Sequence, residues 1–255
     1  SSKTMIYWNG CSFVVGSEVK ERPRDTFAGL VGKHFMTPWW QNAKVGGSND
    51  RIWRTTMDDM IRQPADLVII VWSGLNRFEY LNEKNNTWRS AVWVRHRMNK
   101  ATLKITDDSE VHFHPDMSLE QWKGLQGYAS KIRNARYNLI TSLNYMISIK
   151  YFLEQKGIPY LFYNMSDGQI HPSKRILNED RKEGANTVWE VKHIKEKEYY
   201  NELPHLKEEA FYDMCKRAKV PFGAGDHPLE EGHRLMAKRI IQDIYKYGYD
   251  KIINK

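Results

Sequence analysis

A serine, a histidine and amide donors occupy turns of this 255-residue chain where they could carry out acyl transfer. Ser12 follows a short apolar run and a glycine, His227 precedes a proline near the C-terminus, and Gly47 and Asn76 lie in two further turns. A hydroxyl can act as nucleophile, an imidazole as its general base, and amide N–H groups as donors to the oxyanion that forms. Each residue alone is an ordinary turn residue, so the prediction depends on all of them meeting in one place.

Short apolar runs that alternate with helical patterns predict how these turns are positioned. Strands are expected at Met5–Trp8, Trp39–Val45, Leu67–Trp72 and Ile158–Tyr163. Helices are expected from Phe27 to about His34, from Ser48 or Asn49 to Pro64, and at Ser130–Lys156, Lys207–Arg217 and Leu229–Tyr247. The order predicts a doubly wound α/β domain, in which ligands bind beyond the carboxyl ends of the strands.

The three turns after the first three strands therefore meet at one edge of the expected sheet. Ser12 follows the first strand, Gly47 the second and Asn76 the third. We interpret Asn49 with its neighbour Asp50 only as caps of the following helix, because Asn and Asp are favoured at such positions.

Four segments, in the family's order, resemble the sequence blocks of the SGNH (GDSL-type) hydrolases: Gly10-Cys11-Ser12, Gly47, Gly74-Leu75-Asn76, and His227-Pro228 with Gly232-His233. The resemblance spans residues 5–240. It implies a flavodoxin-like three-layer α/β sandwich with about five parallel strands. It also implies a serine-dependent ester hydrolase that needs neither a metal nor an organic cofactor. We expect His233 to pack or to be solvated rather than to act in catalysis.

The family resemblance also implies a role for each residue of the site. Ser12 would attack the acyl carbon and His227 would take its proton. The N–H groups of Ser12 and Gly47 and the amide of Asn76 would hold the oxyanion. The expected substrate is an ester, such as an acetyl or other acyl group on a carbohydrate or lipid.

Two positions depart from the family's pattern. Cys11 stands where Asp is usual, and Ala224 stands three positions before His227, where the family has the Asp that orients the histidine. The nearest acid is Asp226, which is adjacent to the histidine and does not automatically reach its Nδ1. Four alternatives remain: Asp226 orients the base, another acid does so, the site is a Ser–His dyad, or the chain is a non-catalytic binding protein on the same fold.

Composition limits the remaining classes. A 41% hydrophobic and 27% charged chain is globular, and 255 residues suit one domain, with insertions expected near 82–129 and 165–205. Two cysteines exclude a disulfide framework or a four-thiolate zinc site, and His112 and His114 lack a third metal ligand. No signal sequence or membrane-spanning run is visible, so we expect a soluble, cytoplasmic protein.

The net charge of +8 bears on the substrate. Arg77, Arg95 and Trp93 lie near the expected edge or in the first insertion, so we expect them to contact an anionic glycan or lipid ester. The basic and aromatic residues of segment 89–97 also suit nucleic acid, which is the weaker alternative.

Overall fold

The computed structural model describes residues 4–75, 77–82, 84–92, 118–133, 135–166, 196–203, 206 and 208–253. Four parallel strands form the main sheet: β1 (Ile6–Asn9), β2 (Trp39–Gln41), β3 (Leu67–Trp72) and β6 (Tyr160–Asn164). Their order is β2-β1-β3-β6, so β1 has β2 on one side and β3 on the other. This order is flavodoxin-like. Its switch point lies between the neighbouring strands β1 and β3, and such sheets bind ligands beyond the carboxyl ends of the strands at that point.

The predicted α/β fold is confirmed, with differences in the sheet. The described residues contain four parallel strands rather than about five. The second strand ends at Gln41 rather than at Val45, because the chain then wraps around the end of β1, where Lys44 N donates to Gly10 O at 3.2 Å. Parts of the insertions expected near 82–129 and 165–205 lie outside the described residues.

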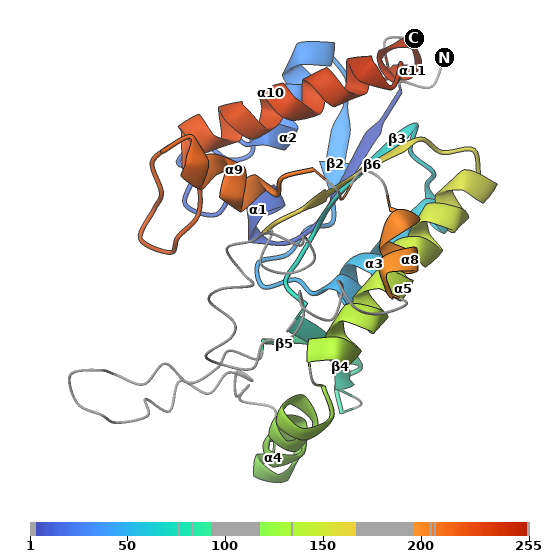
Figure 1. Ribbon diagram of the computed structural model, residues 1–255, viewed down its shortest axis with the longest axis vertical. Helices are drawn as coiled ribbons and strands as arrows, with labels where there is room; N and C mark the ends of the chain where they lie inside the picture. Colours follow the sequence, from blue (N-terminus) through green and yellow to red (C-terminus); the bar gives the residue numbers. More distant parts are fainter. Residues whose placement is uncertain are drawn as a thin grey trace.

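Helices cover both faces of the sheet (Figure 1). One face carries α1 (Ser12–Val15), α2 (Phe27–Phe35), α9 (Phe211–Arg217), α10 (Glu230–Lys246) and α11 (Asp250–Ile253). The other carries α3 (Asn49–Arg62), α5 (Ala135–Gln155) and α8 (Glu196–Asn201). The antiparallel hairpin of β4 (Arg77–Asn82) and β5 (Thr87–Val92), with α4 (Leu119–Gly127), lies at the far end from the chain termini.

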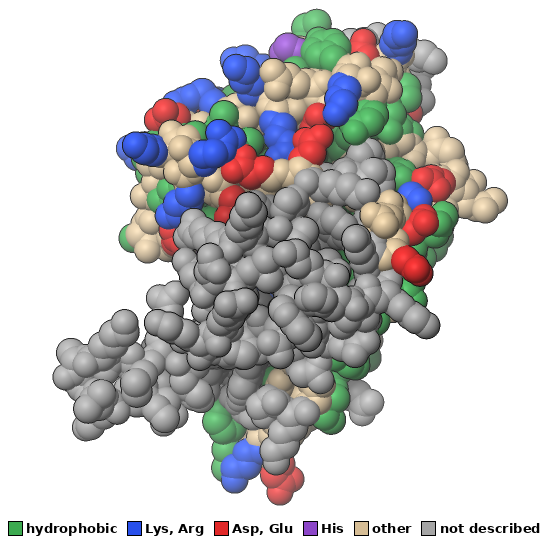
Figure 2. All heavy atoms as spheres, in the orientation of Figure 1, with side chains coloured by type: hydrophobic (Ala, Val, Ile, Leu, Met, Phe, Trp, Pro, Cys, Tyr) green, Lys and Arg blue, Asp and Glu red, His purple; other side chains and the backbone are tan. Residues whose placement is uncertain are grey.

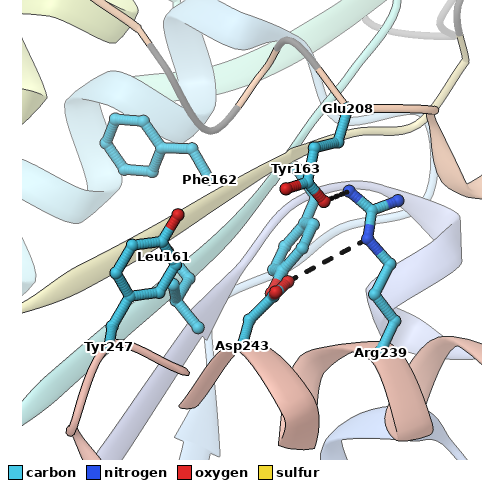
Figure 3. Close-up of a pocket in the computed structure, with 7 residues that line it drawn as sticks. All are labelled: Leu161, Phe162, Tyr163, Glu208, Arg239, Asp243 and Tyr247. Carbon is cyan, nitrogen blue, oxygen red and sulfur yellow. Dashed lines mark hydrogen bonds and ion pairs between the residues drawn. The ribbon is translucent and has the colours of Figure 1, made fainter. Parts of the chain in front are cut away.

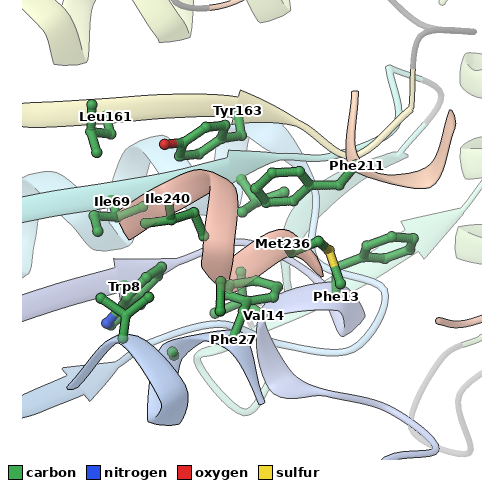
Figure 4. Packing of buried hydrophobic residues seen from close by; sticks show 14 of the residues in the cluster. Trp8, Phe13, Val14, Phe27, Ile69, Leu161, Tyr163, Phe211, Met236 and Ile240 are labelled. Atoms are coloured by element: carbon green, nitrogen blue, oxygen red, sulfur yellow. The ribbon is translucent and has the colours of Figure 1, made fainter. Parts of the chain in front are cut away.

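Alternation along the strands divides the core into two layers. In β3, Leu67, Ile69 and Val71 pack toward α2 and α10, whereas Val68, Ile70 and Trp72 pack toward α3 and α5. Figure 4 shows the first layer, in which Trp8, Phe27 and Ile240 lie together. All six residues of β3 are buried, as expected of a strand covered on both faces.

Two helix boundaries differ from the prediction. The helix expected from Ser130 begins at Ala135, because a π-helical turn (Tyr128–Ile132) precedes it. The helix expected from Lys207 begins at Phe211. The short helix at Phe27 begins as predicted, since Thr26 accepts a hydrogen bond from Gly29 N.

Candidate active site

The serine turn is fixed by a glycine that no other residue can replace without a shift. Gly10 follows β1 with φ of 157°, and a Cβ there would lie 2.8 Å from Val71 O. Ser12 is then the first residue of α1 and is 4% exposed. Val14 N is bonded to Cys11 O, whereas the earlier amides of a helix have no acceptor within it. The Ser12 N–H is thus suited to donate to a ligand beside its own hydroxyl.

The structure brings Ser12 and His227 together. His227 Nε2 lies 2.9 Å from Ser12 Oγ, although 215 positions separate them. The histidine sits in a tight turn closed by a bridge between Phe222 and Pro228 and by the bond from Gly223 N to His227 O at 2.9 Å. This turn leads into α10, so the fold presents the imidazole to the serine turn.

Glu18, a glutamate that belongs to none of the sequence motifs, lies on the other side of the imidazole. Glu18 Oε2 is 2.9 Å from His227 Nδ1. Its carboxylate also accepts hydrogen bonds from Gly225 N at 2.9 Å and His227 N at 3.3 Å. These donors, that of Gly225 first, lower the pKa of Glu18, so the group remains a carboxylate.

Asp226, the expected orienting acid, has other partners. Tyr212 OH donates to its Oδ2 at 2.7 Å and Lys216 Nζ to its Oδ1 at 2.8 Å. Lys216 is the main cause that lowers the pKa of Asp226. The side-chain partners of Asp226 thus lie on α9, which favours the alternative in which another acid orients the histidine.

The loop that carries Gly47 lies against the serine turn. A Cβ on Gly47 would be 2.8 Å from Lys44 O and 3.0 Å from Gly10 O, so any larger residue would force the backbone here to shift. The Gly47 N–H itself donates to Lys44 O at 2.8 Å, within its own loop. Gly47 thus borders the site with its amide already hydrogen-bonded. Asn76 lies outside the described residues.

Asn49 does more than the predicted cap. Its side chain donates to Ser73 O and to Ser142 Oγ, both at 3.1 Å, and accepts from Ser73 N at 2.8 Å. Asn49 is buried and joins α3 to the end of β3 and to α5. Arg77, which starts β4, donates to Ser73 Oγ at 2.8 Å, so its guanidinium lies at the same edge of the sheet. Arg95 and Trp93 lie outside the described residues.

A buried polar network connects the serine turn with the loop that carries Gly47. Asn9 Oδ1 accepts from Gly10 N at 2.8 Å, and Asn9 Nδ2 donates to Tyr7 OH at 2.9 Å. Tyr7 OH donates to Asp59, which also accepts from Asn42 Nδ2 at 2.7 Å. Asn42 begins the loop that carries Gly47. The network therefore connects the serine turn to the loop that carries Gly47. Burial raises the pKa of Tyr7, so its hydroxyl keeps its proton.

His233 packs in the core, which is one of the two roles expected of it. It is 1% exposed, stacks on Phe27 at 5.2 Å and accepts a hydrogen bond on Nδ1 from Phe27 N at 3.0 Å. Burial lowers its pKa to about 4, so the ring is neutral near pH 7. Cys11 is fully buried with its Sγ 3.3 Å from Met165 Sδ, an apolar setting for the position where the family has Asp.

A pocket elsewhere on the domain has its charges satisfied internally (Figure 3). It lies between β6 and α10, where Tyr163 OH donates to Asp243 at 2.8 Å and Arg239 pairs with Glu208 at 3.1 Å. On the face drawn in Figure 2, basic and acidic side chains are interspersed over the described surface. Across the described ranges, no cluster of side chains suits a metal ion, and no helix is long and apolar enough to cross a bilayer.

Comparison with known proteins places the chain in a family. Residues 26–250 match the profile of DUF6071, a family of unknown function. The chain belongs to the DUF6071 family. The matched stretch of this DUF6071 protein includes His227 and begins after Ser12 and Glu18. No curated protein matches the chain.

Solved structures similar to the DUF6071 protein include esterases. The psychrotrophic esterase EstA from Pseudoalteromonas sp., inhibited by monoethylphosphonate, has a TM-score of 0.50 at 8% identity, over 96% of this chain and 98% of that one. A lipolytic protein of the G-D-S-L family from Veillonella parvula DSM 2008 has a TM-score of 0.47 at 14% identity, over 94% and 97%. At such identities the similarity to EstA supports the shared α/β fold alone.

Proposed function

We propose that this protein is a serine-dependent ester hydrolase in which Ser12 is the nucleophile and His227 the general base. The observation that carries the proposal is the 2.9 Å distance between Ser12 Oγ and His227 Nε2. General-base catalysis needs a separation of about 2.6–3.2 Å between the heavy atoms. The similarity to G-D-S-L proteins and esterases agrees with this chemistry at the level of the fold.

The reaction follows from this contact. Ser12 Oγ bonds to the acyl carbon while its proton passes to His227 Nε2. The same proton then goes to the departing alcohol oxygen as the ester C–O bond breaks. Water, deprotonated by His227, next attacks the acyl carbon, and Ser12 leaves with the proton. Both steps pass through a tetrahedral oxyanion, which needs donors that are in place beforehand.

We assign the Ser12 N–H as the first oxyanion donor, because it opens α1 beside the reacting oxygen. The Asn76 amide is the second proposed donor, as the resemblance of Gly74-Leu75-Asn76 to the SGNH pattern implies. The Gly47 N–H is the third, and it would have to share its proton between Lys44 O and the oxyanion, or release Lys44 O. Each well-placed donor lowers the barrier by about 2.7–4 kcal/mol.

For the substrate we propose an acyl ester of a carbohydrate or lipid that carries negative charge. Among the solved structures, one similar chain is a catalytic mutant of an acetylxylan esterase from Geobacillus stearothermophilus, with 13% identity and a TM-score of 0.46, over 96% of this chain and 95% of that one. Arg77 lies at the edge where the site is built, and with Arg95 and Trp93 it would contact the part of the substrate beyond the acyl group.

The test combines active-site labelling with turnover. A fluorophosphonate should label the wild type, and Ser12→Ala should abolish labelling and lower the turnover of p-nitrophenyl acetate by at least ~10³-fold. His227→Ala should lower turnover to a similar extent. Ser17→Ala is the matched control, because Ser17 bonds to Ser12 O only through its backbone N–H. Labelling that persists in Ser12→Ala would refute the assignment of the nucleophile.

One observation favours a second function, a non-catalytic binding protein. The Gly47 amide is already hydrogen-bonded to Lys44 O, which leaves the oxyanion site one donor short in this conformation. This candidate predicts that the wild type neither hydrolyses p-nitrophenyl acetate above the Ser12→Ala background nor reacts with the fluorophosphonate.

A further inference from the structure

We infer that Glu18 is the acid that orients the catalytic histidine, so that the orienting carboxylate comes from the loop after the nucleophile and not from the turn that bears the histidine. This inference rests on the proposed function. Glu18 acts through His227, so it is a positioning residue. Neither Asp226 nor any residue at the position of Ala224 supplies this group.

The contact has the geometry that the role requires. Glu18 Oε2 lies 2.9 Å from Nδ1 of the same ring whose Nε2 lies 2.9 Å from Ser12 Oγ. An acceptor at Nδ1 holds the proton there and leaves the Nε2 lone pair facing the serine. The two side chains are 24% exposed for His227 and 27% for Glu18, so water screens their interaction only in part.

The histidine turn is shaped to admit this carboxylate. A Cβ on Gly223 would lie 2.4 Å from Glu18 Oε1, and one on Gly225 would lie 2.9 Å from Oε2. Side chains at either position would occupy the place of the carboxylate. Two backbone donors, Gly225 N and His227 N, point at the same group. The turn therefore forms a receptor for an acid that arrives from elsewhere in the chain.

The backbone between Ser12 and Glu18 delivers the acid to that place. The single turn of α1 ends at Gly16, whose φ is 75°, and Ser17 N bonds back to Ser12 O at 3.0 Å. Glu18 itself has a φ of 70°, a left-handed conformation that is uncommon for a residue with a side chain. Val19 beyond it is buried. The unfavourable backbone conformation directs Glu18 to the histidine, and such conformations concentrate at functional sites.

Asp226 has a different task on the outer side of the same turn. It fastens the turn to α9 through Lys216 and Tyr212, both of which lie on that helix. The Lys216 ammonium lies 3.7 Å from the ring centroid of Phe222, which begins the turn. Asp226 thus holds the loop from outside while Glu18 holds the histidine from inside.

The experiment replaces each acid by its amide. Glu18→Gln should lower kcat for p-nitrophenyl acetate by about 10²–10⁴-fold with little change in KM, because a tautomer-holding carboxylate is lost. Its pH–rate profile should differ from that of the wild type, because the histidine ring has lost the carboxylate at Nδ1. Asp226→Asn should retain kcat within a few-fold. Glu21→Gln, an exposed acid on the same loop, is the matched control for charge.

Two further measurements separate positioning from folding. Glu18→Ala leaves a space beside Nδ1, so formate should restore part of its activity, which a merely structural role would not allow. Nitrogen-15 NMR of the histidines should show Nδ1 of His227 protonated in the wild type and altered in Glu18→Gln, with or without turnover.

The outcomes distinguish the two proposals. If Ser12→Ala abolishes labelling while Glu18→Gln keeps the wild-type kcat, pH profile and nitrogen-15 shifts, the hydrolase stands and the Glu18 assignment is overturned. The assignment is also overturned if Asp226→Asn has the larger effect. If no variant or wild type reacts at Ser12 but the nitrogen-15 shifts change as stated, the proposed function fails and the positioning contact stands.

Discussion

Stability at acid pH should depend on His233, far more than on any exposed histidine. Its imidazole is 1% exposed, and its Nδ1 accepts a hydrogen bond from the Phe27 N–H. Protonation would therefore place an unpaired charge in the core and break that hydrogen bond. Its pKa of about 4 in the folded protein compares with 6.5 for a free side chain. The unfolded chain therefore binds more protons between these two values, and the folded state loses stability as the pH falls.

The size of the effect follows from the shift. The difference of 6.5 − 4 = 2.5 in pKa corresponds to about 3.5 kcal/mol, at roughly 1.4 kcal/mol for each unit. This contribution is fully present above pH 6.5 and declines as the pH falls toward 4. By pH 4.5 most of it, about 2.5 kcal/mol, is lost.

Urea unfolding at pH 7.5 and 4.5 measures this loss. His233→Asn keeps an acceptor for Phe27 N and cannot be protonated, so its loss of unfolding free energy over this range should be smaller than that of the wild type by about 2.5 kcal/mol. Carboxylates such as Glu18 titrate in both proteins and cancel in the difference. His34→Asn, in which an exposed ring is replaced, is the control. Equal pH dependence in wild type and His233→Asn would refute the reasoning.

Three other substitutions test packing around the site. Cys11→Asp should destabilise the fold by about 3 kcal/mol or more, because a carboxylate would be buried beside Met165 Sδ without a partner. Cys11→Ser should destabilise it less, and urea unfolding compares the two variants. Gly47→Ala places a Cβ 2.8 Å from Lys44 O and 3.0 Å from Gly10 O, so phosphonate labelling should slow by about tenfold or more while the fold persists by circular dichroism. Glu79 is 4% exposed and its partner Arg54 is 24% exposed, so Glu79→Ala leaves a largely buried guanidinium without its carboxylate and should lower the free energy of unfolding by about 3 kcal/mol. Asp25→Ala, which removes the partner of the exposed Arg24, should lower it by less than about 1 kcal/mol. Thermal unfolding measures both losses.

The strands and the serine turn after β1 were predictable because their signals are local. Leu67–Trp72 is an unbroken apolar run, and Thr26 is an N-cap residue just ahead of an apolar helical pattern; both formed as predicted. The turn after β1 needs a glycine with positive φ, and Gly10 is where the sequence offers one. Such features depend on neighbours within a few residues.

Residues that act across the fold could not be assigned from local patterns. Asn49 is of a residue type that commonly caps helices, yet its side chain instead bonds to Ser73 and Ser142 and so links α3 to β3 and α5. Glu18 is 209 positions from its histidine, and its approach depends on a left-handed residue that no propensity favours. A partial signal did exist, since Gly16 predicts a reversal of the chain directly after the one-turn helix that carries Ser12.

The histidine turn shows how one sequence feature supports opposite conclusions. Ala224, compared with the family pattern, reads as the loss of an acid and so as a sign of lost activity. In the structure its two neighbours, Gly223 and Gly225, leave the space that the Glu18 carboxylate fills. Had the usual Asp been present with bulkier neighbours, Glu18 would have been excluded from Nδ1. The acid is missing at position 224, whereas the room for the Glu18 carboxylate comes from the glycines on either side of that position, so both features belong to one turn.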